Sequence, residues 1–125
     1  MASERFERGM KVRREVLGAA YVDKSMAEAD EFSRPMQELV TEYCWGEIWT
    51  QPELPRKTRS LINVAMISAL NRPHELKLHV RGALRNGCSK EEIRAVLMQV
   101  AIYCGVPAAI DGLRVAREVL KEEGL

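Results

Sequence analysis

Apolar residues recur at intervals of three and four in one segment of the chain after another, and this spacing constrains the fold most strongly. No segment alternates apolar and polar residues with a period of two over a useful length. Spacing of three and four places side chains on one face of an α-helix, whereas a half-buried strand needs a period of two. The sequence therefore predicts an all-α fold, a bundle of about six helices.

Glycines, prolines and capping residues separate the predicted helices. The clearest boundary is the capping box Ser89–Glu92, in which two side chains satisfy the first free amides of a helix. The segment 45–55 contains two Trp, one Gly and two Pro and is predicted to interrupt a helix. We expect a weakly helical connector over 19–29 and helices over 3–17, about 31–47, 55–70, 73–86, Ser89 to Gly105 and about 107–122.

The predicted helix 55–70 has little polar face. Its second half carries apolar residues on nearly every side. Such a helix is expected to be buried almost all round, within the domain or at a contact between subunits. The sequence therefore suggests a homo-oligomer.

Length and charge limit the classes of protein that this chain can represent. The 125 residues suit a single domain over 1–125. The 19 basic and 18 acidic residues leave a net charge of +1, which provides no basic surface for nucleic acid or an anionic membrane. We find neither a secretory h-region nor an apolar run of the roughly 18 residues that a membrane span needs, so we expect a cytoplasmic protein.

The sequence contains no motif for a metal or a cofactor. Its three cysteines form no CxxC pair, and we expect them to be reduced, small core residues. The two histidines lack HExxH or Cys/His ligand spacing, and no glycine-rich phosphate loop follows a strand. We therefore expect no metal site, no thiol redox pair and no phosphate-binding loop.

His79 is the first candidate for acid–base chemistry. It lies within a predicted helix, four residues after Glu75 and seven after Arg72, so all three lie near one helix face. Gly82, three residues later, removes side-chain bulk beside the imidazole. The alternative is an ordinary exposed pair of charges four residues apart. The other histidine, His74, looks like a solvated residue at a helix start.

Glu47 is the second candidate acid. It stands between Trp45 and Trp49, and aromatic surroundings would disfavour its charged form, as a general acid requires. The alternative is a surface glutamate in a loop whose tryptophans anchor the core.

Arg56 and Arg59 open a predicted helix and share one face. Cations gain nothing at the positive end of the helix dipole, so an anionic ligand would explain their position. The alternative is ordinary surface charge.

Three stretches of the chain resemble the carboxymuconolactone decarboxylase family. They are EYCWGEIWTQPELPRKTRSL (42–61), RPHELKLHVRGALRNGCSKEEI (72–93) and YCGVPAAIDG (103–112). The N-terminal FERGMKVRREVLGAAYV also resembles the family, so the likeness covers nearly the whole chain. Glu53 departs from the family pattern, in which a glycine commonly follows the tryptophans.

The wider superfamily includes peroxidase-like proteins similar to alkylhydroperoxidase D. Their reactive pair is a CxxC on the helix that carries the histidine. Here the corresponding positions are Arg72 and Glu75. Both thiols are absent, so the resemblance implies no peroxide or disulfide chemistry.

The resemblance implies cofactor-free decarboxylation of 4-carboxymuconolactone to 3-oxoadipate enol-lactone in protocatechuate catabolism. Loss of CO2 sends electrons onto the conjugated lactone carbonyl, so the protein must bind two carboxylates, stabilise an oxyanion and deliver one proton to carbon. Alternatives are a related lactone or enol acid, or a catalytically silent subunit of an assembly. The resemblance also suggests a homohexamer.

We assign roles to the candidate residues from this chemistry. The catalytic set is His79 as proton donor, Glu75 as its orienting carboxylate, and Glu47 as the alternate acid. The binding set for the anionic lactone consists of arginines for carboxylates and the oxyanion, and tryptophans for the apolar wall: Arg72, Arg56, Arg59, Trp45 and Trp49.

Overall fold

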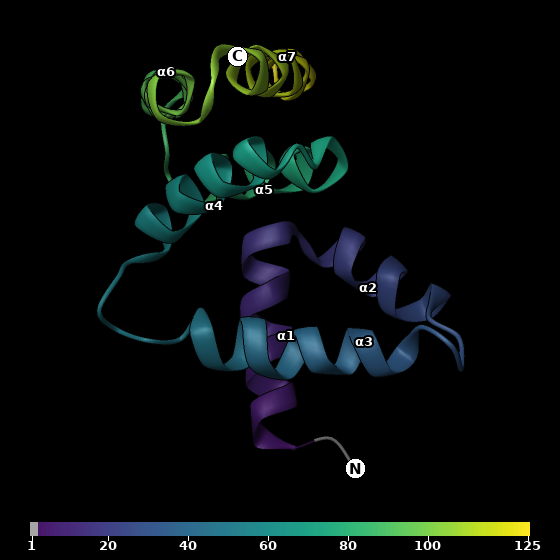
Figure 1. Cartoon of the computed structure of the whole chain (residues 1–125). Helices are drawn as coiled ribbons and strands as arrows, with labels where there is room; N and C mark the ends of the chain where they lie inside the picture. The colour runs from purple at the N-terminus through teal and green to yellow at the C-terminus, as the bar shows by residue number, and fades with distance from the viewer. Residues whose placement is uncertain (1–2) are drawn as a thin grey trace. The chain divides into compact units, whose positions relative to one another are not determined.

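The computed structural model describes residues 3–125, and every regular element in that range is a helix (Figure 1). Seven α-helices and one π-helix follow one another along this part of the chain. The all-α prediction is confirmed, although there are more helices than the six or so that we expected. The chain divides into two compact units, unit 1 up to Leu54 and unit 2 over Pro55–Leu125. The single domain over 1–125 stays a prediction.

Helix α1, Glu4–Leu17, has the boundaries that the sequence predicted. Its N-cap is Ser3, whose hydroxyl accepts a hydrogen bond from the Phe6 amide at 3.0 Å. It ends at Gly18, which has a φ of 95°, a conformation that favours glycine. Local capping therefore fixes both ends of this helix.

Helix α2, Ala19–Glu28, corrects the expectation of a weakly helical connector over 19–29. Val22 is its one fully buried position, so the helix has no long apolar stripe that a periodicity argument could detect. Contacts with α1 stabilise it instead, and they include an ion pair between Arg14 and Asp23 at 2.8 Å. Packing against α1 therefore stabilises α2 as a helix, and its sparse hydrophobic pattern could not predict this.

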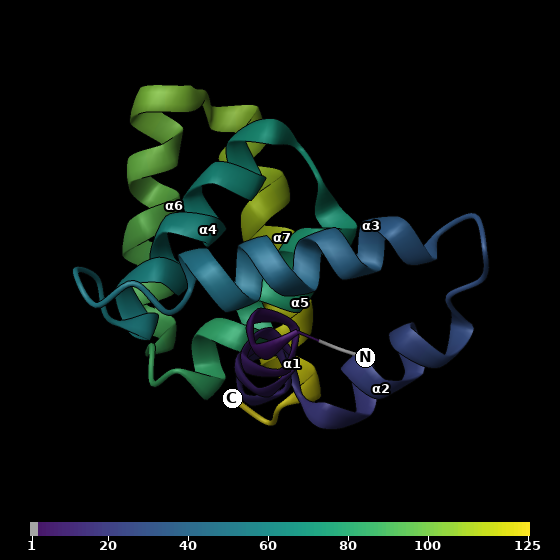
Figure 2. The ribbon, with the colours of Figure 1, turned by 90° about the horizontal axis from the view of Figure 1, so that it is seen from below.

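Helix α3, Arg34–Leu39, continues directly into the π-helix η1, Val40–Ile48 (Figure 2). The helix predicted over about 31–47 is thus present, but its second half is wound more widely. The predicted interruption begins only at Trp49, and Trp45 lies inside η1, so the expected break over 45–55 starts four residues too early.

Backbone contact between α1 and η1 shapes unit 1. A Cβ atom on Gly9 would lie 1.9 Å from the carbonyl oxygen of Thr41, so only glycine permits this approach. The side chain of Arg8 donates from Nε to the carbonyl oxygen of Gly46 at 3.0 Å. These contacts join residues more than thirty positions apart in the sequence.

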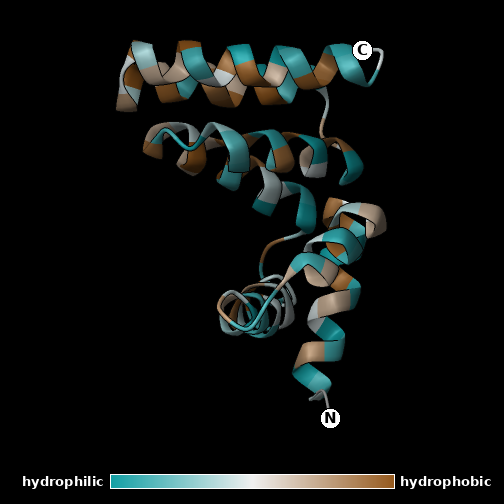
Figure 3. Ribbon diagram, turned by 90° about the vertical axis from the view of Figure 1, so that its right-hand side faces the viewer, coloured by the Kyte–Doolittle hydropathy of each residue, from teal (hydrophilic) through white to brown (hydrophobic). Residues whose placement is uncertain are grey.

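Unit 2 consists of four helices in two layers, with α4 and α5 in one layer and α6 and α7 in the other (Figure 1). Their bounds are Arg56–Leu70, Pro73–Arg85, Lys90–Cys104 and Val106–Glu122, close to the predicted ranges. The helices are amphipathic, and hydrophobic and hydrophilic positions alternate around their turns (Figure 3). The buried core between them is Val64, Leu76, Val80, Ala83, Cys88, Ile93, Leu97, Ala116 and Val119.

The predicted capping box of α6 is confirmed. The Ser89 amide donates to Glu92 Oε1 at 2.9 Å, and the Glu92 amide donates to Ser89 Oγ at 3.0 Å. The pKa of the Glu92 carboxyl is lowered, first by the hydrogen bond from the Ser89 backbone and then by that from Lys57. The start of α6 is therefore fixed by its own first turn.

Helix α4 is less buried than the sequence suggested. Ser60, Val64 and Ser68 are buried, whereas Met66 and Leu70 are exposed in this chain. Burial of α4 on all sides within its own domain is therefore wrong. Burial of its outer face at a contact between subunits stays a prediction.

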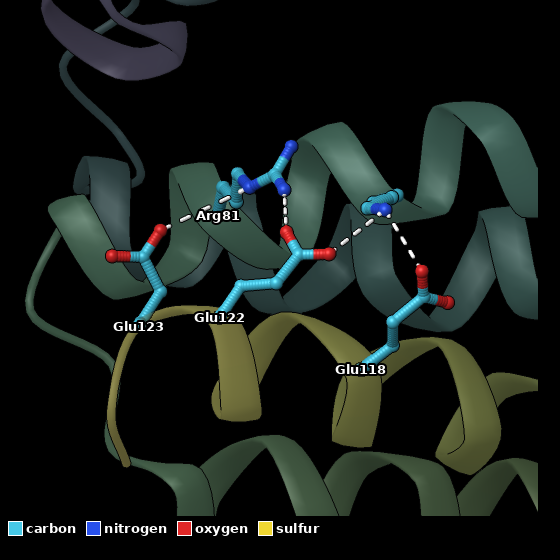
Figure 4. A network of polar contacts seen from close by, with 5 residues as sticks. Arg81, Glu118, Glu122 and Glu123 are labelled. Atoms are coloured by element: carbon cyan, nitrogen blue, oxygen red, sulfur yellow. Dashed lines mark hydrogen bonds and ion pairs between the residues drawn. The ribbon is translucent and has the colours of Figure 1, made fainter.

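An ion-pair network joins α5 to α7 (Figure 4). Lys77 Nζ lies 3.0 Å from carboxylate oxygens of both Glu118 and Glu122, and Arg81 pairs with Glu122 and with Glu123. These bonds raise the pKa of Lys77 and lower that of Glu122. Each such pair contributes little to stability at a surface, but the network specifies how α5 and α7 align.

The three cysteines are free thiols in different surroundings. Cys88 is buried as expected, Cys44 is half-buried, and Cys104 is exposed, so the prediction of core positions is wrong for Cys104. Within residues 3–125, we find no helix with the length and apolar character that a bilayer crossing demands.

Candidate functional site

His79 lies on α5, where it is half-buried and faces α4. Its Nδ1 atom is 3.4 Å from the side-chain amide nitrogen of Asn63, on α4. Burial lowers the pKa of the imidazole, because removal from water disfavours the charged ring, and the charge of Glu75 partly opposes this effect. The neutral imidazole is therefore favoured in the chain by itself.

The relation between Glu75 and His79 is electrostatic. Glu75 is exposed, one helical turn before His79, and its charge raises the pKa of the histidine. The residue placed beside Nδ1 is Asn63, which the sequence analysis missed. Asn63 lies sixteen positions away on another helix, so no spacing rule within one helix could find it. The orienting role assigned to Glu75 stays a prediction.

Arg72 is bound to the end of α4. Its Nη1 atom donates to the carbonyl oxygens of Leu70 and Asn71 at 3.1 and 3.3 Å. A cation at this position stabilises the negative end of the helix dipole. The structure thus gives Arg72 a capping contact, and its carboxylate binding stays a prediction.

Arg56 and Arg59 are half-buried at the other end of α4. The 15 residues of α4 extend about 22 Å, and Arg72 lies beyond its last residue. Within one chain, Arg56 and Arg72 are therefore too far apart to bind one small lactone together. The three predicted arginines form two separate groups rather than one binding set.

Trp45 and Trp49 stack on each other in the core of unit 1. Their ring centroids are 4.8 Å apart, and their exposed fractions are only 3% and 6%. Glu47 points to solvent, with 47% of its side chain exposed, and pairs with Arg5 Nε at 3.0 Å. The apolar surroundings expected for the Glu47 carboxyl are therefore absent from unit 1. The catalytic role of Glu47 and the wall role of the tryptophans remain predictions.

The predicted site residues thus belong to both units. Trp45, Glu47 and Trp49 belong to unit 1, and the arginines, Glu75 and His79 to unit 2. Within unit 2, the structure brings together His79, Glu75 and the unpredicted Asn63.

A second unpredicted feature is Arg13, which is buried in unit 1 with 5% exposure. Its Nη1 atom donates to Thr41 Oγ1 at 3.2 Å and to the sulfur of Met26 at 3.6 Å. Burial lowers the pKa of this guanidinium. No carboxylate pairs with Arg13 in the part of the chain that the structure describes. Such a cation is costly to bury, and sequence reasoning gave no sign of it.

A groove of about 630 Å³ lies between α6 and α7, and none of the predicted site residues is among those that line it. Apolar side chains and the cations of Lys90, Arg94, Arg114 and Arg117 line it. It has no histidine, cysteine or carboxylate among these residues, so it offers no group to deliver a proton near neutral pH. Among residues 3–125, no three His, Cys, Asp or Glu side chains gather where they could hold a metal ion.

Comparison with known proteins identifies the family. Residues 34–118 match the carboxymuconolactone decarboxylase family. The chain is 37% identical to a 4-carboxymuconolactone decarboxylase of Acinetobacter baylyi, over 98% of this chain and 91% of that protein. It is 42% identical to a nitrosuccinic acid decarboxylase of Metarhizium robertsii, over 94% of this chain and 82% of that protein. From its sequence and from these comparisons, the chain belongs to the carboxymuconolactone decarboxylase family.

Proposed function

We propose that this protein is a decarboxylase of small dicarboxylic anions, with 4-carboxymuconolactone as its first candidate substrate. The products would be 3-oxoadipate enol-lactone and CO2, formed without a cofactor, in protocatechuate catabolism. The observation that carries the proposal is 37% identity to a decarboxylase of that substrate across 98% of the chain. The half-buried imidazole of His79 supplies a group that can carry the required proton.

The two named relatives suggest one shared chemistry. 4-Carboxymuconolactone and nitrosuccinic acid each carry two acid groups and one group that can accept an electron pair. When the carbon–carboxylate bond breaks, its electron pair passes to the lactone carbonyl or to the nitro group. The resulting anion must then take up one proton on carbon. A protein that acts on either substrate needs cations and one well-placed acid.

His79 is the proton donor in this proposal. Its pKa is lowered in the chain alone, so it carries little charge near neutral pH. A bound dianion would favour the imidazolium form, since a nearby negative charge stabilises it. Substrate binding would thus favour protonation of His79, which then holds the proton that the reaction consumes.

Arg59 is the best-placed carboxylate ligand on α4. It stands one helical turn before Asn63, which contacts His79, and Arg56 lies three residues earlier on the same face. Arg72 lies at the opposite end of α4, so it would bind a different acid group from the one that Arg59 binds. Glu47 remains the alternate acid, with Trp45 and Trp49 as the proposed apolar wall.

The test is loss of 4-carboxymuconolactone, followed by ultraviolet absorbance, on adding protein treated with EDTA. Rapid loss together with released CO2 supports the proposal and argues against a required metal. Nitrosuccinic acid is assayed in parallel, because the chain is 42% identical to a protein named for that substrate. Turnover of nitrosuccinic acid alone would move the assignment to that acid. Turnover of neither by a folded protein would refute it.

We also propose that the protein is a homo-oligomer, specifically a hexamer. Apolar side chains remain exposed on α4 and α6 in the single chain, and such surface favours association with another subunit. They are Ile62, Met66, Leu70, Met98, Ile102 and Tyr103. Light scattering should give a mass near six times 14.2 kDa, and Ile102→Glu should lower it. A wild-type mass of one chain would overturn this proposal.

A further inference from the structure

The contact between Asn63 and His79 has a chemical direction. The amide nitrogen of Asn63 carries only hydrogen-bond donors, and it lies 3.4 Å from His79 Nδ1, at the long end of hydrogen-bonding range. A neutral imidazole has one donor nitrogen and one acceptor nitrogen. If the amide donates to Nδ1, then Nδ1 is the acceptor and the ring proton must be on Nε2.

Asn63 is held in place by the helices around it. Next to it, Val64 is fully buried in the core of unit 2, and so is Val80 next to His79. One turn earlier on α4, Ser60 Oγ accepts a hydrogen bond from Asn86 at 2.9 Å. The contact between Asn63 and His79 therefore belongs to a row of polar contacts that sets the register of α4 against α5.

From this geometry we infer that Asn63 is a positioning residue, which holds the neutral ring of His79 in the tautomer that carries its proton on Nε2. The inference rests on the proposed function for its catalytic consequence only. The tautomer itself is a property of the folded chain and can be measured without substrate.

The catalytic consequence follows from the two orientations of an amide. When His79 becomes charged, both ring nitrogens are donors, so the amide nitrogen of Asn63 would oppose Nδ1. Rotation of the amide by half a turn would present its oxygen to Nδ1 instead. Asn63 can therefore donate a hydrogen bond to the neutral ring and, after rotation, accept one from the charged ring. The charge that also acts on the ring is that of Glu75 on α5, which raises the pKa of His79.

The test is nitrogen NMR of protein labelled with ¹⁵N-histidine, in which His79 and His74 are the only two imidazoles and each contributes two ring nitrogens. A His74→Gln variant assigns them. We expect His79 to show a protonated Nε2, and Asn63→Leu to shift its Nδ1 signal. A wild-type ring protonated on Nδ1 would overturn the inference, and so would an unchanged spectrum in Asn63→Leu.

Asn86→Ala is the matched structural control. It removes the neighbouring hydrogen bond to Ser60 on the same row but touches neither Asn63 nor His79. We expect it to lower the melting temperature and to leave the His79 spectrum unchanged. If Asn86→Ala changes that spectrum as much as Asn63→Leu does, general loosening explains both and the inference is overturned.

Activity separates this inference from the proposed function. In a protein that turns over substrate, Asn63→Leu should lower kcat by roughly tenfold, as expected for the loss of one hydrogen bond. Asn63→Asp should restore part of kcat and shift the alkaline limb of the pH profile upward, because a carboxylate favours the imidazolium that donates the proton. If the expected tautomer is found in a protein that acts on neither substrate, the proposed function fails and the positioning of His79 stands.

Discussion

Glu47 in unit 1 is half-exposed and ion-paired, whereas His79 in unit 2 is half-buried against another helix. The sequence alone did not reveal this difference. Both residues were chosen because apolar or oppositely charged neighbours stand close to them in the sequence. Glu47 lies between two tryptophans, but residues two apart point to opposite sides of a helix. Trp45 and Trp49, four apart, share a face and stack in the core, which leaves Glu47 in solvent beside Arg5.

His79 meets the opposite condition. The His79 side chain faces α4, where Asn63 lies beside Nδ1. Burial there lowers the pKa of the imidazole. For Glu47, closeness to the tryptophans in the sequence did not give the apolar surroundings that we expected in unit 1. For His79, the contact with Asn63 on another helix shapes the surroundings of the ring. For His79, burial outweighs the charge of its sequence neighbour Glu75, so the surroundings that the fold creates have the larger effect on its pKa.

The largest expected effect is on turnover. His79→Ala should lower kcat by about 10²- to 10⁴-fold, the usual contribution of a general acid. His74→Ala, an exposed histidine on the same helix, is the matched control and should be close to wild type. Glu47→Gln should retain most of the activity, because its carboxyl is solvated and paired with Arg5. A loss in Glu47→Gln as large as in His79→Ala would reverse the comparison.

The tryptophan pair should matter most for stability. Trp45→Ala removes a buried, stacked ring and should lower the free energy of unfolding by about 3–5 kcal/mol, measured by denaturant titration. Trp49→Phe keeps an aromatic ring and should cost less. If Trp49→Phe instead raises KM while stability is unchanged, the tryptophans contact substrate as the wall that the sequence suggested.

The pH dependence of stability should reveal the burial of His79. Its folded pKa lies below its unfolded value, so the unfolded chain binds more protons when the pH falls below about 6.5. The stability contributed by the neutral ring is complete above that pH and is lost as the pH falls toward the folded pKa, with a slope of at most about 1.4 kcal/mol per pH unit. In His79→Gln this part of the slope should disappear. An identical acid dependence in wild type and variant would show that His79 titrates as a solvated residue.

The smallest effects compare the two units directly. Ser3→Ala and Ser89→Ala each remove an N-cap hydrogen bond, one in unit 1 and one in unit 2, and each should cost about 1 kcal/mol. If residues 1–125 are one cooperative domain, calorimetry will show both variants shifting the same single transition. Two transitions, each moved by one variant only, would contradict the single-domain prediction.

Some features of this protein followed from the sequence because their interactions span a single helical turn. The Ser3 cap and the Ser89–Glu92 box each join residues three apart, and the ends of α4 and α5 fall at Pro55, Asn71 and Pro73, so spacing and residue type sufficed. The family resemblance likewise depended on motifs that can be read in order along the chain. The stacking of Trp45 on Trp49 also has four-residue spacing and could have been predicted.

Other features depend on residues that only the folded chain brings together. Helix α2 has too few buried positions to be predicted from its hydrophobic pattern. The π-helix η1 lies where its own backbone approaches Gly9 of α1 and where Arg8 donates to the Gly46 carbonyl oxygen. Asn63 joins His79 across sixteen residues and two helices. Periodicity reports which face of a helix is buried but not which side chain of another helix it meets. The sequence by itself therefore determined the class of fold and most helix boundaries. Tertiary packing decided what surrounds the imidazole of His79 and, within unit 1, the carboxyl of Glu47.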